Sequence, residues 1–96
     1  MNDNKNDTLF ACITHYKHLV NGGNRWGFST RVKLFQTEAE AIEFGKDQIL
    51  SLKLLSDEFF IEGLLLEFEK TKRHDFASCF VEIVETETLI TRKENE

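Results

Sequence analysis

The sequence predicts an α+β fold of order β-β-α-β-β, in which four antiparallel strands form one sheet and one helix packs on one face. Three observations lead to this prediction. Two apolar segments, 8–20 and 25–35, flank an Asn-Gly-Gly-Asn sequence, a helix-capping pattern follows at 37–40, and further apolar segments lie in the second half. Ninety-six residues suffice for a single domain, which we place at residues 8–89, between a polar arm (1–7) and a solvated tail (90–96).

The first two segments are expected to form a hairpin. The glycines and asparagines at 21–24 accept the positive φ angles that tight hairpin turns require. No helix follows directly to offer its N-terminal amides to a phosphate, which argues against a phosphate-binding loop.

The length of the turn decides which hairpin side chains share a face. A loop of two or four residues pairs even-numbered with odd-numbered positions, and a three-residue loop pairs even with even. The first arrangement is favoured: it buries Leu9, Ala11, Ile13, Leu19, Trp26, Phe28, Val32 and Leu34 and displays Tyr16, His18, Arg25, Arg31 and Lys33. The second turns inward Phe10, Cys12, Tyr16 and Val20, and the pattern leaves open which face is buried.

A helix is predicted to begin at Thr37, because Thr37 and Glu40 have the spacing of a capping box. Continued to Leu55, its core side carries Ala41, Gly45, Ile49, Leu52 and Leu55. The opposite side carries Glu43, Asp47, Leu50 and Leu54, which form a contact stripe if the helix is continuous. If the helix ends after Leu50, the alignment of these residues is only an artefact of the assumed helix boundary.

Residues 57–70 leave strand and helix open, with the alternation of Leu64, Leu66 and Phe68 favouring a strand. The residues at 73–75 read as a polar turn before a last strand at 76–90. That strand and the first one are apolar on both faces, which is typical of central strands. We therefore predict the strand order 2-1-4-3, and a single helix leaves part of the second sheet face for a partner or a second copy.

Composition points to the cytoplasm and away from membranes. No segment approaches the roughly 20 apolar residues of a membrane span, and the polar start does not resemble a secretory signal. Cys12 and Cys79 fit buried apolar positions rather than a disulfide framework.

No catalytic, cofactor or metal site is predicted, so we expect a protein that is not an enzyme. His15 and His18 are three residues apart on a strand and point to opposite faces, which prevents joint metal binding. His74 lies in the predicted turn, where a solvated side chain is expected.

Charge is distributed unevenly along the chain, whose net charge is −5. Residues 1–36 hold five basic and two acidic residues, whereas 37–96 hold seven basic and fifteen acidic residues. One candidate surface is cationic and aromatic (Tyr16, His18, Arg25, Arg31, Lys33), but the acidic remainder argues against direct nucleic-acid binding. The favoured partner-binding surface is acidic and would meet a basic surface of another protein: Glu40, Glu43, Asp47, Leu50, Leu54, Asp57 and Glu58.

In size and charge, though in no motif, the chain resembles the small acidic inhibitors and immunity proteins of phages and mobile elements. The resemblance implies a non-catalytic protein-binding module, for instance an inhibitor of a host complex that handles nucleic acid. The alternative is a homodimeric structural or accessory subunit that buries its spare sheet face or helix stripe against a copy.

Overall fold

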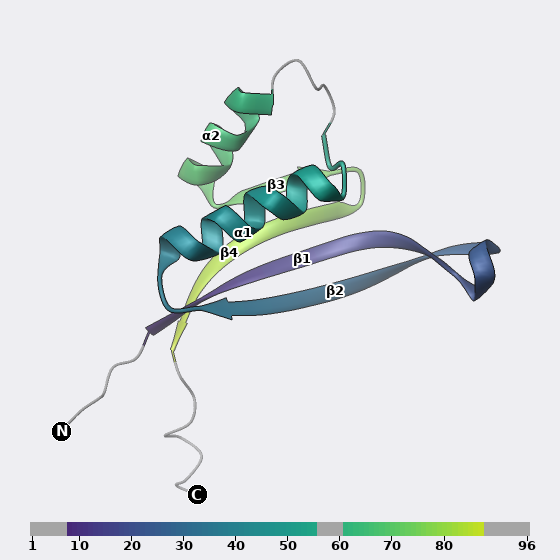
Figure 1. Cartoon of the computed structure of the whole chain (residues 1–96), viewed down its shortest axis with the longest axis horizontal. Coiled ribbons are helices and arrows are strands. Elements are labelled where there is room, and N and C mark those ends of the chain that lie inside the picture. The colour runs from purple at the N-terminus through teal and green to yellow at the C-terminus, as the bar shows by residue number, and fades with distance from the viewer. Residues whose placement is uncertain (1–7, 56–60, 88–96) are drawn as a thin grey trace, which may run out of the picture.

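The computed structural model describes residues 8–55 and 61–87. In chain order these residues form β1 (Thr8–Val20), a 3-10 turn η1 (Asn21–Gly23), β2 (Arg25–Phe35), α1 (Glu38–Ser51), α2 (Ile61–Thr71), β3 (Arg73–Phe76) and β4 (Cys79–Glu87). The strands make one antiparallel sheet in the order β2-β1-β4-β3, which confirms the predicted α+β class and strand order (Figure 1). The predicted arm (1–7) and tail (90–96) lie outside the described residues.

The turn between β1 and β2 is a hairpin bend, as predicted. Asn21, Gly22 and Gly23 all have positive φ (52°, 68° and 92°), and the N–H of Asn24 donates to the carbonyl of Val20 at 3.1 Å. A run of left-handed residues strongly favours glycine and asparagine, so the composition of the turn follows from its geometry.

The start of α1 also agrees with the sequence. The Thr37 hydroxyl oxygen accepts a hydrogen bond from the backbone N–H of Glu40 at 3.2 Å, and Thr37 itself has extended backbone angles. The cap satisfies one of the N–H groups that a helix N-terminus leaves without a partner.

The end of α1 lies earlier than predicted. The helix ends at Ser51, Lys53 adopts a φ of 56°, and the N–H of Leu54 donates to the carbonyl of Ile49 at 2.9 Å. This reversal turns Leu54 into the core, where it is 5% exposed, whereas Leu50 is 40% exposed. The prediction that Leu50 and Leu54 share an outward stripe is therefore wrong for Leu54. The apparent stripe results from extending the helix beyond its true end at Ser51.

The prediction of a single helix is wrong. Most of residues 57–70, which the sequence allowed to be either a strand or a helix, belong to the second helix, α2. Leu64, Leu65 and Phe68 have helical spacing and pack against the core, with Phe68 only 1% exposed. The alternation of Leu64, Leu66 and Phe68 that favoured a strand is misleading, because Leu66 is 58% exposed and only the residues at helical spacing face the core.

The third strand is the four-residue β3, in the place of the predicted polar turn. Its His74 is half-buried, and its Nε2–H donates to the carbonyl of Leu54. The expectation of a solvated His74 is therefore wrong, because this imidazole satisfies a carbonyl in the segment that follows α1.

Both helices lie on the same side of the sheet, with α1 packed across β1 and β4 and α2 packed at the β3 edge. The register pairs Val20 with Arg25 across a four-residue loop, which confirms the even-with-odd pairing. The favoured choice of buried face is wrong, however, because the helices cover the face that carries Cys12, Thr14 and Val81, all fully buried. Small side chains at the centre of this face let α1 approach the sheet closely, which a surface of large aromatic rings would prevent.

The β1–β2 hairpin projects beyond the remainder of the molecule (Figure 1). β4 pairs with β1 only between Thr8 and His15, so the distal part of the hairpin is a two-stranded arm. The Cα atoms span 49 × 35 × 15 Å. The shortest dimension corresponds to one sheet covered by one layer of helices.

Candidate protein-binding surfaces

A shallow hollow lies between α1 and the end of β2, and we call it the α1–β2 groove. Its volume is about 440 Å³, and it is lined by Phe35, Ala39, Glu40, Glu43, Phe44 and Asp47. The rings of Phe35 and Phe44 contact each other with centroids 5.4 Å apart and form an apolar floor. The groove therefore combines aromatic surface with three carboxylates.

The carboxylates come from one side of α1. Glu40, Glu43 and Asp47 follow one another at spacings of three and four residues, which places them on adjacent turns of one helix side. Leu50 continues this line and is exposed. The predicted acidic residues on the helix are thus brought together, while Asp57 and Glu58 lie outside the described residues and Leu54 is in the core.

These carboxylates are only partly neutralised by the chain itself. The Lys46 Nζ atom lies 3.5 Å from a carboxylate oxygen of Glu43, but its main partner is Glu69 of α2. The hydrogen bond to Glu69 raises the pKa of Lys46 above its ordinary value. Among residues 8–55 and 61–87, no ion pair involves Glu40 or Asp47. The groove retains acceptor capacity for a cation from outside.

The predicted cationic and aromatic surface lies on the hairpin beside this groove. The Arg31 guanidinium lies 4.8 Å from the Tyr16 ring centroid and donates to Oε1 of Gln48 on α1 at 2.9 Å. The Lys33 ammonium lies 5.5 Å from the Phe44 ring centroid. His18 is hydrogen-bonded to the Ser29 hydroxyl at 2.7 Å.

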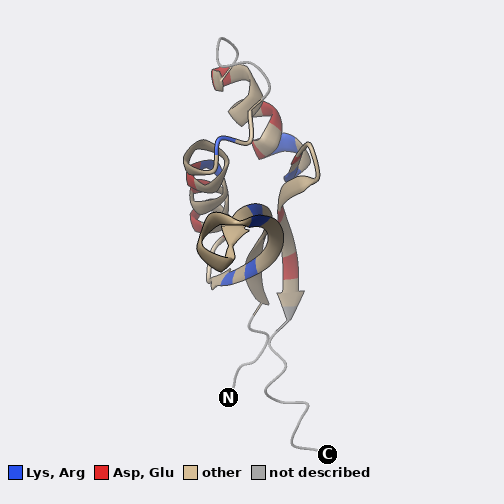
Figure 2. Ribbon diagram, turned by 90° about the vertical axis from the view of Figure 1, so that its right-hand side faces the viewer, with Lys and Arg blue, Asp and Glu red and all other residues tan. Residues whose placement is uncertain are grey.

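The two surfaces that the sequence separated therefore meet along one side of the molecule. By register, Tyr16, His18, Arg25, Arg31 and Lys33 all belong to the sheet face that α1 partly covers. Figure 2 shows basic residues along the hairpin and acidic residues on α1. Within the described ranges, no ion pair joins the acidic side of the groove to Arg31 or Lys33.

The opposite sheet face carries a second candidate surface, which we call the open face. It consists of the odd-numbered residues of β1 (9–19), the even-numbered residues of β2 (26–34) and β4 (80–86), and Arg73 and Asp75. No helix in the described part of the chain packs on it. Five large apolar side chains there are 49–61% exposed: Leu19, Trp26, Phe28, Val32 and Leu34.

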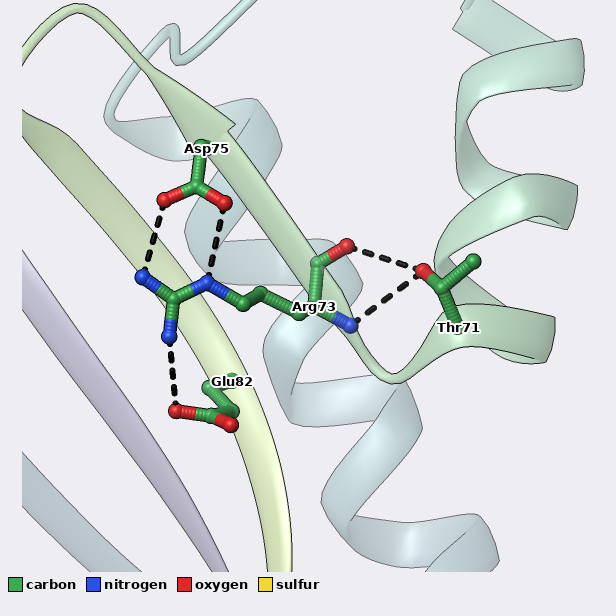
Figure 3. Close-up of polar contacts among 4 residues, drawn as sticks. All are labelled: Thr71, Arg73, Asp75 and Glu82. Atoms are coloured by element: carbon green, nitrogen blue, oxygen red, sulfur yellow. Dashed lines mark hydrogen bonds and ion pairs between the residues drawn. The ribbon is translucent and has the colours of Figure 1, made fainter.

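The charged groups of the open face are organised around Arg73 (Figure 3). Its guanidinium donates to both carboxylate oxygens of Asp75 and to Glu82, each at 2.9 Å, and stacks 4.3 Å from the Phe80 ring centroid. The hydrogen bond from Arg73 lowers the pKa of Asp75 below its ordinary value. Sequence reasoning missed this cluster, although Arg73 and Asp75 are two apart and would share a face of any strand.

His15 and His18 lie on opposite faces of the sheet, as their spacing along a strand predicted. His15 lies on the open face, stacked between Phe28 and Phe80 with centroids 5.3 and 5.5 Å away, and is hydrogen-bonded to the Thr30 hydroxyl at 2.9 Å. His18 lies on the other face. Over the described residues, no three His, Cys, Asp or Glu side chains gather as metal ligands.

No family model matches the chain, and no curated protein or solved structure matches it at a significant level. None of the helices in the described ranges is long and apolar enough to cross a membrane.

Proposed function

We propose that this protein is a non-catalytic protein-binding module that takes a basic segment of another protein into the α1–β2 groove. The observation that carries the proposal is the combination of an aromatic floor, Phe35 and Phe44, with carboxylates at Glu40 and Asp47 that have no ion-pair partner among the described residues. A hollow with this lining suits a lysine or arginine side chain better than it suits a phosphate or a neutral ligand.

The chemistry of recognition follows from the shape of such a side chain. Its aliphatic stem packs on the two phenylalanine rings, and its charged end reaches the carboxylates at the rim. Cation–π attraction adds to this where the charge passes over a ring, as the Lys33 ammonium already does 5.5 Å from the Phe44 centroid.

A partner with a basic surface also fits the charge of the whole chain. A net charge of −5 attracts a cationic protein over several ångströms and speeds encounter, while it repels the backbone of a nucleic acid. Proteins that handle nucleic acid carry basic sites for the phosphates, and an acidic module that covers such a site would act as an inhibitor. This is the finer form of the proposal, and the small size and acidity of the chain favour it.

A fluorescein-labelled octapeptide of alternating lysine and leucine is a suitable probe, with its glutamate–leucine counterpart as the control ligand. We expect saturable one-to-one binding of the basic peptide by fluorescence anisotropy, and an affinity that falls on going from 50 to 300 mM salt. Glu40→Lys/Asp47→Lys should raise the dissociation constant at least tenfold, a rough figure for two lost charge contacts.

The matched control is Glu62→Lys/Glu67→Lys, which makes the same change of net charge at two exposed carboxylates of α2. It should change the dissociation constant by less than about threefold at 150 mM salt, because screened charges far from the site contribute little. Equal losses for both double variants would show that only net charge matters. Salt-independent binding, or tighter binding of single-stranded DNA than of the peptide, would also contradict the proposal.

The second candidate function, a homodimeric structural or accessory subunit, is favoured by the exposed apolar side chains of the open face.

A further inference from the structure

We infer that the open face is a homodimer interface, in which the sheets of two copies pack face to face around a two-fold axis. The proposal concerns the side of the molecule opposite the α1–β2 groove and does not depend on what the groove binds.

Three of the four charged groups of the open face are already ion-paired within it. The four charged residues are Lys17, Arg73, Asp75 and Glu82. Arg73 holds both carboxylates in hydrogen-bonded ion pairs, and the Lys17 ammonium lies 4.9 Å from the Trp26 ring centroid. Burying charges without partners is the usual cost of covering a polar surface. A second sheet packed on this face would bury few such charges.

Neutrality favours a second copy over other occupants of this face. The two basic and two acidic residues cancel, so the open face has no net charge, although the chain as a whole carries −5. Two copies that met through their helices would bring acidic surfaces together, whereas the open face can meet itself without that repulsion. A strongly basic or acidic partner would find no complementary charge here.

The size of the face is adequate for a dimer. Strands of these lengths, at about 3.3 Å per residue and about 4.8 Å between strands, give a flat footprint of roughly 590 Å². Accessible area exceeds this projection because side chains as large as Trp26 and Phe28 stand above it, which brings the face close to the roughly 800 Å² per partner of a standard interface. Sheets that pack in this way keep their strands within about 30° of each other and need apolar inner faces, which Val32 and Leu34 provide.

Sedimentation velocity of the full 96-residue chain between 1 and 100 μM tests the inference. We expect a reversible shift from the 11.2 kDa monomer to a species of twice that mass. The single tryptophan, Trp26, supplies a second signal, because its 61% exposed side chain becomes buried and its emission should shift to shorter wavelength as the concentration rises.

Two aspartate substitutions at equally exposed positions locate the interface. Val32 is 57% exposed on the open face and Leu66 is 58% exposed on α2, so both variants should remain folded, which circular dichroism checks. Val32→Asp should raise the dimer dissociation constant by on the order of 100-fold, because it buries a new charge without a partner. Leu66→Asp should leave it unchanged within about threefold, as expected for a site outside the interface.

A wild-type chain that stays monomeric at 100 μM would overturn the inference, as would a dimer that persists in Val32→Asp or is lost in Leu66→Asp. Persistence in Val32→Asp would direct attention to pairing along the free edge of β2. The octapeptide assay on Val32→Asp separates the two proposals, because peptide binding through the groove should survive whatever becomes of the dimer.

Discussion

Replacing Gly45 by alanine should destabilise the fold, although alanine is the better helix former. A Cβ atom at position 45 would lie 2.7 and 2.8 Å from two ring atoms of Phe68 and 3.4 Å from Cδ1 of Ile83, where ordinary contacts lie at 3.4–4 Å. Phe68 is 1% exposed, so its ring has no open space into which it can retreat by the roughly 0.7 Å that separates 2.7 Å from an ordinary 3.4 Å contact. Overpacking of this kind costs about 1–3 kcal/mol.

The gain in helix propensity offsets part of this cost. Alanine in place of glycine within a helix contributes about 0.8–1 kcal/mol, so the net loss in the free energy of unfolding should be about 1 kcal/mol. For a domain of this size the loss lowers the melting temperature by roughly 4–8 °C. Because α2 packs on α1 through this contact, the substitution tests how closely the two helices meet.

Urea unfolding followed by circular dichroism at 222 nm measures the loss, since both helices contribute to the signal, whereas Trp26 is exposed on the hairpin. Gly63→Ala is the matched control: Gly63 lies in α2, and among the described residues no atom from another part of the chain comes within 4 Å of an added Cβ. It should stabilise the protein by about 0.5 kcal/mol, since Gly63 is close to the helix start. A Gly45→Ala protein as stable as Gly63→Ala would refute the close contact between α1 and α2.

Two further substitutions test the corrected end of α1 and the cluster around Arg73. Leu54→Ala should cost about 2–4 kcal/mol because Leu54 is buried, whereas Leu50→Ala on the exposed helix side should stay within about 0.5 kcal/mol in the same urea assay; similar losses would contradict the early end of the helix. The lowered pKa of Asp75 means that its ionised form stabilises the fold, so this contribution is complete above the ordinary pKa of 3.8 and is lost as the pH falls through the lower folded value. Asp75→Asn should therefore reduce the change of the urea midpoint between pH 2 and 5. The reduction should be small because the Asp75 side chain is 60% exposed. A variant whose midpoint changes with pH as the wild type does would argue against the pairing with Arg73.

The sheet could be predicted from the sequence because its determinants are local. The glycines at 22 and 23 specify the bend, and apolar residues on both faces mark β1 and β4 as central strands. The capping residues Thr37 and Glu40 likewise locate the start of α1. Each of these signals involves neighbouring residues or a simple period, so no knowledge of packing was needed.

The features that could not be predicted depend on contacts between distant segments. Residues 61–71 carry apolar side chains at both strand and helix spacings, and the insertion of Phe68 between Gly45 and the sheet selects the helix. The buried face was misassigned for a related reason. Hydrophobicity favours the side with Trp26 and Phe28, but α1 needs the side where small residues such as Cys12 let it approach.

The candidate site was predicted in part. The acidic series Glu40, Glu43 and Asp47 follows from helical spacing alone, since its members lie within one helix. Its aromatic floor requires the β2 residue Phe35 to meet Phe44 of α1, which the sequence pattern does not specify. The proximity of the hairpin cations to the helix acids depends on the same packing.

The two proposals, taken together, give the molecule a consistent arrangement. Since both helices lie on one sheet face, a dimer formed through the open faces directs both helical layers outward and leaves both α1–β2 grooves accessible. Two grooves held in one rigid assembly bind a partner with repeated basic segments more tightly than either does alone, because the second contact becomes intramolecular. A dimer formed through α1 would instead cover the groove, so the face that closes the dimer also determines whether the proposed binding site remains available.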